Sequence, residues 1–391
     1  MSNEKQDVLL AWQLADNFGW GVAGLNIFMN WCFNNGPRPT MLHNIESSHV
    51  SGVHPLRIAS LAPEFGRSNS TSQMILEKMK QGAVSVSCPI VHALGNNFAS
   101  GSPNLIGTKN IGRMVFEFPL PKEARKETEK FDLLVVASKW NQMVLQSITD
   151  VPVILNHEGV DDTMFFPAPS RGLAPSNCFY VFSGGKPELR KGQDLVLAAF
   201  KQFAKNKLDV RLVTAWQSPW PGLSEGLRGC LQQPLRVRNG IIDVHDWAEA
   251  NGLAAGKVID VGKIPNSQAA TLLREVDCSI QLSRCEGGTN FVAMESLACG
   301  IPTLMSACSG HMDIIQTPGV IPITSPNRPD LSYHLDEHWG EPDIDEATNS
   351  LEAIYAEWKR TGEKARSSGR FERTWHHHSL ELETIISEAG N

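Results

Sequence analysis

Short apolar runs alternate with longer mixed segments along the whole chain, a pattern typical of β-strands that alternate with helices. The runs of the first half that are expected to form strands are residues 8–14, 40–45, 84–91, 113–117, 133–137 and 151–155. Those of the second half are residues 179–183, 210–214, 258–261, 279–282 and 303–306. Segments between them, among them 193–205 and 267–275, are expected to be helical. This order of elements predicts parallel sheets covered by helices.

A stretch rich in proline, residues 167–176, separates the two series of strands and is typical of a linker. With 391 residues, the chain is also too long for one ordinary hydrophobic core. We therefore predict an α/β fold with two doubly wound, Rossmann-like parallel-sheet domains. Ligands in such sheets bind beyond the carboxyl ends of the strands, and we expect those ends to face a cleft between the domains.

Composition narrows the class of protein. The chain has 41% hydrophobic and 20% charged residues, which is ordinary for a soluble globular protein. A formal net charge of -7 argues against a nucleic-acid partner, because no dense basic face is available to offset phosphate repulsion. The N-terminal residues lack the order of a signal peptide, no apolar run reaches transmembrane length, and the eight cysteines are scattered. We therefore expect a cytoplasmic protein with reduced thiols.

Residues 283–302 are the most informative stretch, because they contain two acids in different settings. Glu286 lies beside Gly287 and Gly288, which allow a tight turn between a short strand and a helix. Glu295 lies inside that helix among apolar neighbours, where a carboxylate is costly unless it has a hydrogen-bonding partner. A bound ligand is a candidate for that partner.

The start of this helix offers further groups. Thr289 or Asn290 can cap it, and the free N–H groups of a helix start can bind an anion or a sugar hydroxyl. A ligand site and a simple capped corner between strand and helix are both compatible with the segment taken alone.

A second candidate segment begins the second series of strands. The strand ends at Gly184 and Gly185, and three cations follow before the next helix, namely Lys186, Arg190 and Lys191. Cations beside a helix start are what a diphosphate needs for charge neutralisation. A solvated basic loop is the ordinary alternative, but this loop is expected at the same edge of the sheet as the two acids.

The first series contains a pattern that favours another function. Gly19, Gly21 and Gly24 follow the first strand and open a predicted helix, and Glu46 ends the next strand, where a dinucleotide fold places a ribose-binding acid. This pattern taken alone indicates an NAD-dependent oxidoreductase. The turn before the glycines is longer than in that fingerprint, so a phosphate or acceptor loop of another α/β enzyme is an equal alternative.

Taken together, these segments resemble the family 4 glycosyltransferases, which are retaining enzymes that use nucleotide sugars and have the GT-B fold of two facing Rossmann-like domains. The matching segments in chain order are residues 156–161, 185–192, 261–277, 286–302 and 371–380. The first of them resembles the crossing between the domains, and the last resembles a C-terminal helix that folds back on the first domain. The predicted bounds are 1–165 for the acceptor domain, 166–177 for the linker, 178–370 for the nucleotide-sugar domain and 371–391 for the final helix.

Two features depart from the usual pattern of the family. Eight residues separate Glu286 from Glu295, whereas the family usually has seven, and the turn Glu-Gly-Gly-Thr-Asn resembles a subset with one extra residue. The family commonly has Arg where this chain has Lys186, which exchanges a bidentate fork for a point charge.

The resemblance implies a role for each group. Glu295 would accept hydrogen bonds from the ribose diol of the donor, and Glu286 would hold the hydroxyls of the donor hexose. Lys186 and Lys191, with Arg190, would stabilise the departing nucleoside diphosphate. Further donor contacts would come from Gly21, Gly185, Gly287, Gly288, Thr289 and Asn290. The resemblance implies no cofactor and no metal.

Other residues are weaker candidates. His92 matches a histidine that family members place near the transferred sugar, although a lone histidine at a strand end is often structural. Glu117 could orient the acceptor, although a glutamate at a strand end is usually just solvated. Trp216 and Trp220 could stack on a base or a sugar, with ordinary packing as the alternative. Residues 309–313 contain the letters Ser, His and Asp of a hydrolase triad, but side chains so close in sequence cannot adopt its geometry.

The sequence therefore predicts a retaining hexosyltransferase that needs no metal. Its partners would be a UDP- or GDP-sugar and a glycan, lipid-linked or other hydroxyl acceptor, with peripheral membrane contact compatible with a lipid-linked acceptor. The alternatives are the NAD-dependent oxidoreductase and a non-catalytic nucleotide-sugar-binding protein. The sequence does not specify the donor base, the sugar, the acceptor or the oligomeric state.

Overall fold

The computed structural model describes residues 5–95, 97–118, 120, 125–325, 339–367 and 371–388. The chain divides into two compact units, which are described one at a time. The first unit comprises Met1–Asp161, Pro265–Ser267 and Arg373–Asn391, and the second comprises Asp162–Ile264 and Gln268–Glu372. The chain first leaves the first unit after Asp161, so residues 166–177 belong to the second unit. The predicted bound between residues 370 and 371 adjoins residues 368–370, which lie outside the described part of the chain.

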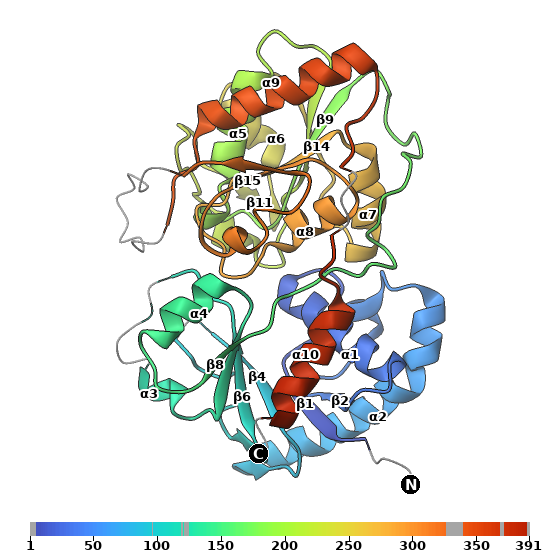
Figure 1. The fold of residues 1–391 in the computed structure, drawn as a ribbon, viewed down its shortest axis with the longest axis vertical. Coiled ribbons are helices and arrows are strands. Elements are labelled where there is room, and N and C mark those ends of the chain that lie inside the picture. The colour runs from blue at the N-terminus through green and yellow to red at the C-terminus, as the bar shows by residue number, and fades with distance from the viewer. Residues whose placement is uncertain are drawn as a thin grey trace. The chain divides into compact units, whose positions relative to one another are not determined.

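The first unit is built on a six-stranded parallel sheet with strand order β2-β1-β4-β6-β7-β8 (Figure 1). Its strands are β1 (Asp7–Ala11), β2 (Arg38–Met41), β4 (Ile90–Leu94), β6 (Asn110–Met114), β7 (Leu133–Val136) and β8 (Val153–Leu155), with a small pair formed by β3 (Val84–Ser85) and β5 (Leu105–Ile106). Its helices are α1 (Gly19–Phe33), α2 (Pro55–Met79), α3 (Arg125–Thr128), α4 (Lys139–Gln146), α10 (Trp375–Glu388) and the 3-10 turn η1 (Ser47–Val50).

The last helix of the chain, α10, packs on α1 within the first unit. The indole N–H of Trp31 on α1 donates to the carbonyl of Ser379 on α10 at 3.0 Å, and both residues are buried. Leu382 and Ile386 of α10 join the same hydrophobic core as Trp31. Burial of this apolar face holds α10 against α1.

The second unit repeats the architecture with strand order β13-β10-β9-β14-β15-β16, again parallel throughout (Figure 1). Its strands are β9 (Phe179–Gly184), β10 (Val210–Ala215), β13 (Val258–Asp260), β14 (Cys278–Gln281), β15 (Thr303–Ser306) and β16 (Val320–Ile323), with a small hairpin of β11 (Val237–Arg238) and β12 (Ile241–Ile242). Its helices are α5 (Gln193–Phe203), α6 (Val244–Ala250), α7 (Asn266–Glu275, from Gln268 onward in this unit), α8 (Phe291–Ala298), α9 (Ile344–Thr361) and the 3-10 turns η3 (Leu189–Lys191), η4 (Pro221–Ser224) and η5 (Ser309–Asp313).

The predicted fold class is confirmed, since both sheets are parallel, doubly wound and alternate with helices. In the second unit, the strand order also locates the switch point, where the order of the strands reverses. From β9 the chain moves to β10 and β13 on one side and then returns to place β14 on the other side. The carboxyl ends of β9 and β14 therefore flank the switch point, where open α/β sheets bind ligands.

Proline explains two differences from the strand predictions. The run expected as one strand over 84–91 divides into β3 and β4, because Pro89 has no N–H to donate to a ladder. The strand β16 was not predicted, since it contains Pro322, but proline is tolerated there because β16 is an edge strand. Within the described residues, no helix combines the length and the apolar character needed to cross a membrane.

Candidate functional site

The loop after β9 reaches the end of β14 because of two glycines. Gly185 has a φ of 106° and Gly192 a φ of 67°, which side chains other than glycine rarely adopt. A Cβ atom on Gly192 would collide with the carbonyl oxygen of Leu282, directly after β14. The backbone N–H groups of Arg284 and Cys285 donate to the carbonyl of Arg190, at 2.7 and 3.3 Å. The cationic loop is thus attached to the loop that carries Glu286.

The turn between β14 and α8 is capped by Asn290. Its φ of 63° is left-handed, and its Oδ1 accepts the N–H of Ala293 at 3.3 Å. The hydroxyl of Thr289 instead donates to the sulfur of Met294 at 3.1 Å. The sequence left the cap open between Thr289 and Asn290, and the structure assigns it to Asn290.

The carboxylate of Glu286 is the centre of the site and is 3% exposed. Lys191 Nζ lies 2.7 Å from Oε1 and 2.8 Å from Oε2, and the guanidinium of Arg190 lies 3.3 Å from Oε2. The hydroxyl of Ser283 donates to Oε1 at 2.5 Å, and the side-chain amide of Asn290 donates to the same atom at 3.1 Å. Both oxygens therefore have several donors.

A second acid, Glu188, continues this network on the cationic loop. Its Oε1 lies 2.5 Å from Lys186 Nζ, and its Oε2 lies 2.7 Å from Arg190 Nε. Because Arg190 contacts both acids, the chain of charges runs from Lys186 through Glu188 and Arg190 to Glu286 and Lys191. The three cations and Glu286 were predicted from the sequence, whereas Glu188 was not, since a glutamate in a polar loop gives no signal of its own.

The charges decide the protonation state of these acids. Burial alone would raise the pKa of Glu286, but the positive charges of Lys191 and Arg190 outweigh it and lower the pKa to about 2. Burial opposes the ionised form of Glu188 in the same way, and Arg190 and Lys186 lower its pKa. Both carboxylates are therefore ionised at neutral pH.

Glu286 should consequently contribute to stability in a pH-dependent way. Its folded-state pKa is below its ordinary value of 4.5, so the contribution is present in full well above pH 4.5 and is lost as the pH falls toward 2. From this shift we expect a contribution on the order of 3 kcal/mol at neutral pH. The measurement is the free energy of unfolding in urea for the wild type and Glu286→Gln across this range. A difference between the two proteins that does not shrink with falling pH would contradict the assignment.

Arg284 is fully buried next to the candidate site and connects the segments that form it. Its guanidinium donates to both oxygens of Asp194, at 2.8 and 2.7 Å, and to both oxygens of Glu341, at 2.6 and 2.9 Å. It also donates to the carbonyl of Leu189 at 2.8 Å, on the cationic loop. Arg284 therefore ties this loop, α5 and the loop after β14 together.

The 3-10 turn η5 supports Glu286 from the side of β15. The hydroxyl of Ser309 accepts the N–H of Glu286 at 2.8 Å, and the N–H of Gly310 donates to the carbonyl of Glu286 at 2.9 Å. A side chain at Gly310 would collide with the carbonyl of Gly288. The turn residues Gly287 and Gly288 are buried, and their predicted contacts to a donor stay predictions.

Glu295 lies on α8, as predicted, and is 8% exposed. Its negative charge helps to raise the pKa of Cys299, although burial of that thiol is the larger cause. The role of Glu295 toward a ribose stays a prediction.

The predicted residues of the first unit are placed differently from expectation. His92 is the middle residue of β4 and not a strand end, and it is 3% exposed. Its ring nitrogens lie 3.0 Å from the Ser100 hydroxyl and 3.3 Å from Asn110 Oδ1, and burial lowers its pKa. This is the arrangement of a structural histidine, and its catalytic role stays a prediction. The strand β6 ends at Met114, so Glu117 lies beyond the strand that was expected to end with it.

The glycines after β1 belong to α1, which begins at Gly19. A Cβ atom on Gly21 would lie 2.7 Å from the Cβ of Ala15, and one on Gly24 would lie 2.6 Å from the indole nitrogen of Trp12. These glycines therefore permit close packing on the preceding loop, which accounts for them without a bound phosphate. The donor contact predicted for Gly21 stays a prediction.

Glu46 does not end a strand, since β2 ends at Met41. It caps η1 instead, in a reciprocal arrangement with His49. The ribose-binding acid of the dinucleotide pattern thus has a local structural role.

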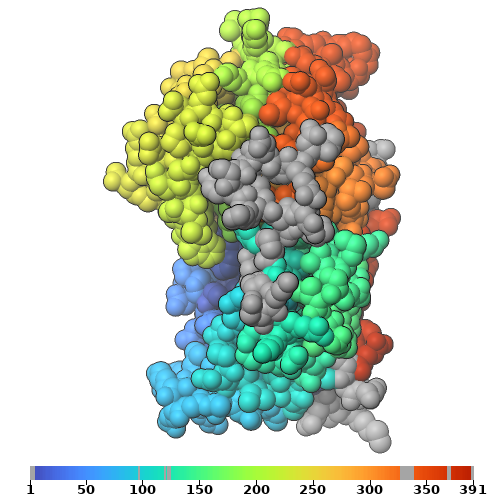
Figure 2. Space-filling model, turned by 90° about the vertical axis from the view of Figure 1, so that its left-hand side faces the viewer, coloured from blue at the N-terminus to red at the C-terminus, as the bar shows by residue number. Residues whose placement is uncertain are grey.

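The two tryptophans differ in exposure. Trp216 is fully buried, donates to the hydroxyl of Ser183 at 3.3 Å and packs against Trp247, so it is a core residue. Trp220 is 51% exposed, and Lys186 Nζ lies 5.8 Å from the centre of its ring. It belongs to the segment between β10 and β13, which forms part of the surface of the second unit (Figure 2, yellow-green).

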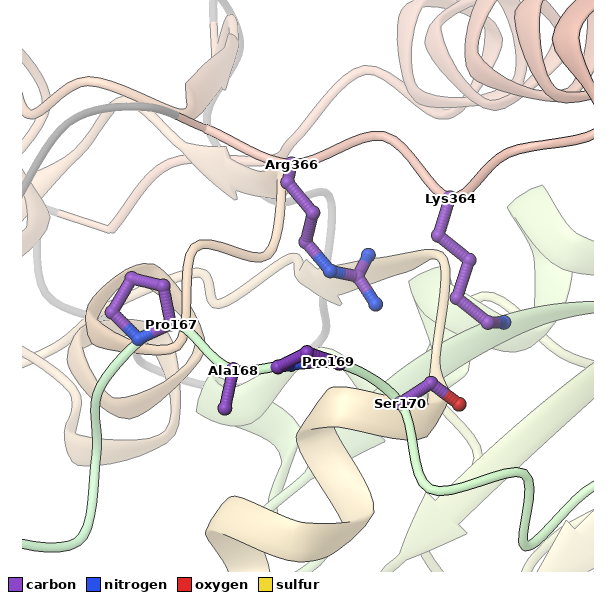
Figure 3. A pocket seen from close by; sticks show the side chains of 6 residues that line it. All are labelled: Pro167, Ala168, Pro169, Ser170, Lys364 and Arg366. Carbon is purple, nitrogen blue, oxygen red and sulfur yellow. The ribbon is translucent and has the colours of Figure 1, made fainter.

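A cavity of about 450 Å³ lies elsewhere in the second unit, between the linker and the segment before α10 (Figure 3). Its lining residues are Pro167, Ala168, Pro169, Ser170, Lys364 and Arg366. Lys364 contacts Asp277, which precedes β14, whereas Glu286 follows β14. The cavity is therefore at the amino edge of the sheet, opposite the charged network. It contains no residue of the predicted site.

No family model matches the sequence, and no curated protein matches it. Solved structures do match in fold over nearly the whole chain. Sucrose-phosphate synthase from Thermosynechococcus elongatus matches with a TM-score of 0.65 at 15% identity, covering 98% of this chain and 99% of its own. The Anabaena protein HepE in complex with UDP and glucose matches with a TM-score of 0.57 at 12% identity, covering 98% of this chain and 97% of its own. A glycosyltransferase from Rickettsia africae matches with a TM-score of 0.58 at 13% identity, covering 99% of each chain. The protein has the fold of these proteins, the GT-B architecture of two Rossmann-like units.

Proposed function

We propose that this protein is a retaining glycosyltransferase that moves a hexose from a UDP- or GDP-sugar to a hydroxyl group of a glycan, a lipid-linked sugar or another acceptor. One observation carries the proposal. Three cations and an ionised, buried carboxylate form one network at the switch point of the second sheet. A diphosphate needs clustered cations, and a hexose needs a fixed acceptor of hydroxyl hydrogens. The structural neighbour HepE, in complex with UDP and glucose, supports this class of donor.

The cations would act on the leaving group. As the bond from the anomeric carbon to the diphosphate breaks, its electron pair departs with the phosphate oxygen, and negative charge grows there. Lys191, Lys186 and Arg190 would stabilise this charge, and such preorganised groups are usually the largest single contribution to catalysis. In this proposal the three cationic side chains neutralise the charge that a metal ion neutralises in other transferases. The proposed reaction is therefore metal-independent.

The two glutamates would hold the rest of the donor. Glu286 would exchange part of its present hydrogen bonds for hydroxyls of the hexose, and Glu295 would accept from the ribose diol. With both carboxylates used for binding, retention would follow from attack on the face that the leaving group vacates. The acceptor oxygen bonds to the anomeric carbon through an oxocarbenium-like state, and its proton passes to the departing phosphate.

The test combines binding and transfer. Titration with UDP, GDP and NADH, followed by tryptophan fluorescence, should show binding of one of the nucleoside diphosphates. Hydrolysis of the matching sugar donor, or its transfer to a panel of acceptors, should then be detected. Tight binding of NADH without response to UDP or GDP would overturn the proposal. Binding of a donor without transfer or hydrolysis would establish the non-catalytic alternative instead.

Glu295→Gln tests the ribose contact. Loss of a charge-assisted hydrogen bond should weaken nucleoside diphosphate binding by roughly 10- to 100-fold, because such bonds contribute about 1.5–3 kcal/mol. The dissociation constant is the measurement. Glu352→Gln is the matched control, since Glu352 pairs with Lys207 and is half-exposed on α9. Equal affinity in Glu295→Gln and the wild type would remove Glu295 from the site.

A further inference from the structure

His311 lies in the segment Ser309–Asp313, which has the letters of a hydrolase triad but no such geometry. Its ring is completely buried and points toward the glutamate turn of the candidate site. Its Nδ1 lies 3.0 Å from the carbonyl oxygen of Ser306, and its Nε2 lies 3.1 Å from the side-chain nitrogen of Asn290. A carbonyl only accepts, so the proton is on Nδ1, and Nε2 is left to accept from Asn290.

The orientation of the Asn290 amide follows from its other contacts. Its oxygen accepts the backbone N–H of Ala293, which can only donate, so the amide nitrogen faces the other way. That nitrogen has two hydrogens, and its two partners are His311 Nε2 and Glu286 Oε1, each at 3.1 Å. Every hydrogen-bonding group of the Asn290 side chain is therefore used, and each has a partner of the required kind.

We propose that His311 is a positioning residue for sugar transfer, which acts through Asn290 to fix the orientation of the Glu286 carboxylate. The relay runs from the Ser306 carbonyl through the neutral ring of His311 to the Asn290 amide and then to Glu286. The functional part of this inference rests on the proposed function, in which Glu286 holds the donor hexose. The relay itself consists of hydrogen bonds, so its existence can be tested without a measurement of activity.

The relay needs a neutral His311, and its surroundings keep it neutral. Burial lowers the pKa of His311 below its ordinary value of 6.5 and outweighs the opposing field of Glu286, while the positive charge of Lys191 acts in the same direction as burial. Glu286 belongs to the turn, and Lys191, which pairs with it, belongs to the cationic loop; both charges act on the pKa of the ring. A protonated ring would present an N–H to the N–H of Asn290. Transfer should therefore be sustained down to a pH below 6.5 and then fall as His311 gains a proton.

The first experiment examines the relay directly in the wild type. Long-range proton–nitrogen NMR of the histidine rings reports which ring nitrogen holds the proton. The neutral tautomer with the proton on Nδ1 is expected for His311. The opposite tautomer, or a protonated ring at neutral pH, would overturn the relay.

The second experiment is a cycle of three variants measured for kcat, donor KM and thermal stability. His311→Leu removes the acceptor, and Asn290→Gly removes the amide while tolerating the left-handed backbone. Misplacement of Glu286 should reduce kcat about 100-fold in each single variant. The double variant should be no worse than Asn290→Gly, because both changes break the same relay. Additive losses, or a kcat of His311→Leu equal to that of the wild type, would overturn the proposal.

Two further proteins separate positioning from folding. In His311→Gln a side-chain oxygen can accept from Asn290, so part of the lost kcat should return, and the acid limb of the pH profile should disappear. His378→Leu is the matched control, since His378 is also buried and also bonded to a backbone carbonyl, at 2.9 Å from that of His157 in the first unit. It should lower thermal stability without the kcat loss. An equal kcat loss in this control would reduce His311 to a general structural role.

The two proposals fail in different ways. A wild type that transfers no sugar from any donor contradicts the proposed function and leaves the NMR result as the test of the relay. A wild type that is active while His311→Leu keeps its kcat contradicts the relay alone.

Discussion

Replacing Lys191 by alanine is expected to reduce the turnover of sugar transfer by about 100- to 1000-fold. Lys191 Nζ lies within 2.8 Å of both oxygens of Glu286 and compensates the buried acid. In the proposed reaction the same cation would also receive the charge of the departing diphosphate. Its loss removes the second interaction and leaves Glu286 with weaker compensation from Arg190. The measurement is kcat with saturating donor, together with the dissociation constant of the nucleoside diphosphate.

Two control variants test whether the loss of turnover comes from the loss of positive charge at Lys191. Lys191→Arg keeps the charge and should retain more activity than Lys191→Ala. Lys359→Ala removes a half-exposed cation of α9 that pairs with Asp209, and it should leave turnover unchanged because exposed ion pairs contribute little. A turnover of Lys191→Ala within a few-fold of the wild type would mean that the charged network is not the place of leaving-group stabilisation.

Replacing Arg284 by methionine is expected to lower the free energy of unfolding by about 3–5 kcal/mol. The side chain is fully buried between Asp194 and Glu341, and its removal leaves the fully buried carboxylate of Asp194 without its cation. Denaturation in urea at neutral pH measures the effect. Because Arg284 also donates to the carbonyl of Leu189, transfer activity should fall even where the variant remains folded.

A second replacement distinguishes the effect of the uncompensated Asp194 charge from a simple loss of packing. Adding Asp194→Leu to Arg284→Met removes the stranded charge, so part of the lost stability should return. Arg38→Met is the surface control, since Arg38 and Asp7 are each half-exposed, and it should cost less than about 1 kcal/mol. A small effect of Arg284→Met, similar to that of Arg38→Met, would show that Arg284 does not hold the loops of the site together.

The parallel sheets could be predicted from local pattern because each strand is an apolar run of its own. The runs over 210–214 and 303–306 became β10 and β15 with bounds that agree within one residue. The helix α2 was not predicted, because its serine-rich sequence with Pro63 lacks a clear apolar face. Its stability comes from packing on the sheet and not from its own periodicity.

The site shows the same division. Gly185, Lys186, Lys191 and Glu286 were predicted because glycine and charge at the ends of apolar runs are visible in sequence. Two partners of these charges, Glu188 and Ser283, were not predicted, since they are ordinary polar residues in loops. Arg284, which pairs with Asp194 and Glu341, was not predicted for the same reason. His311 was set aside as part of a false triad, and only its contact with Asn290 connects it to Glu286.

The sequence by itself determined the alternation of strands and helices, the two parallel-sheet units and the cationic and acidic segments at strand ends. These properties depend on the periodicity and composition of neighbouring residues. Only the tertiary structure decided which carboxylate compensates which cation, which glycines serve packing and which histidine contacts the amide of Asn290. The contacts of Lys191 with Glu286, of Arg284 with Asp194 and of Asn290 with His311 join residues 95, 90 and 21 positions apart in the chain. Their geometry exists only after the sheet has brought the carboxyl ends of β9, β14 and β15 together.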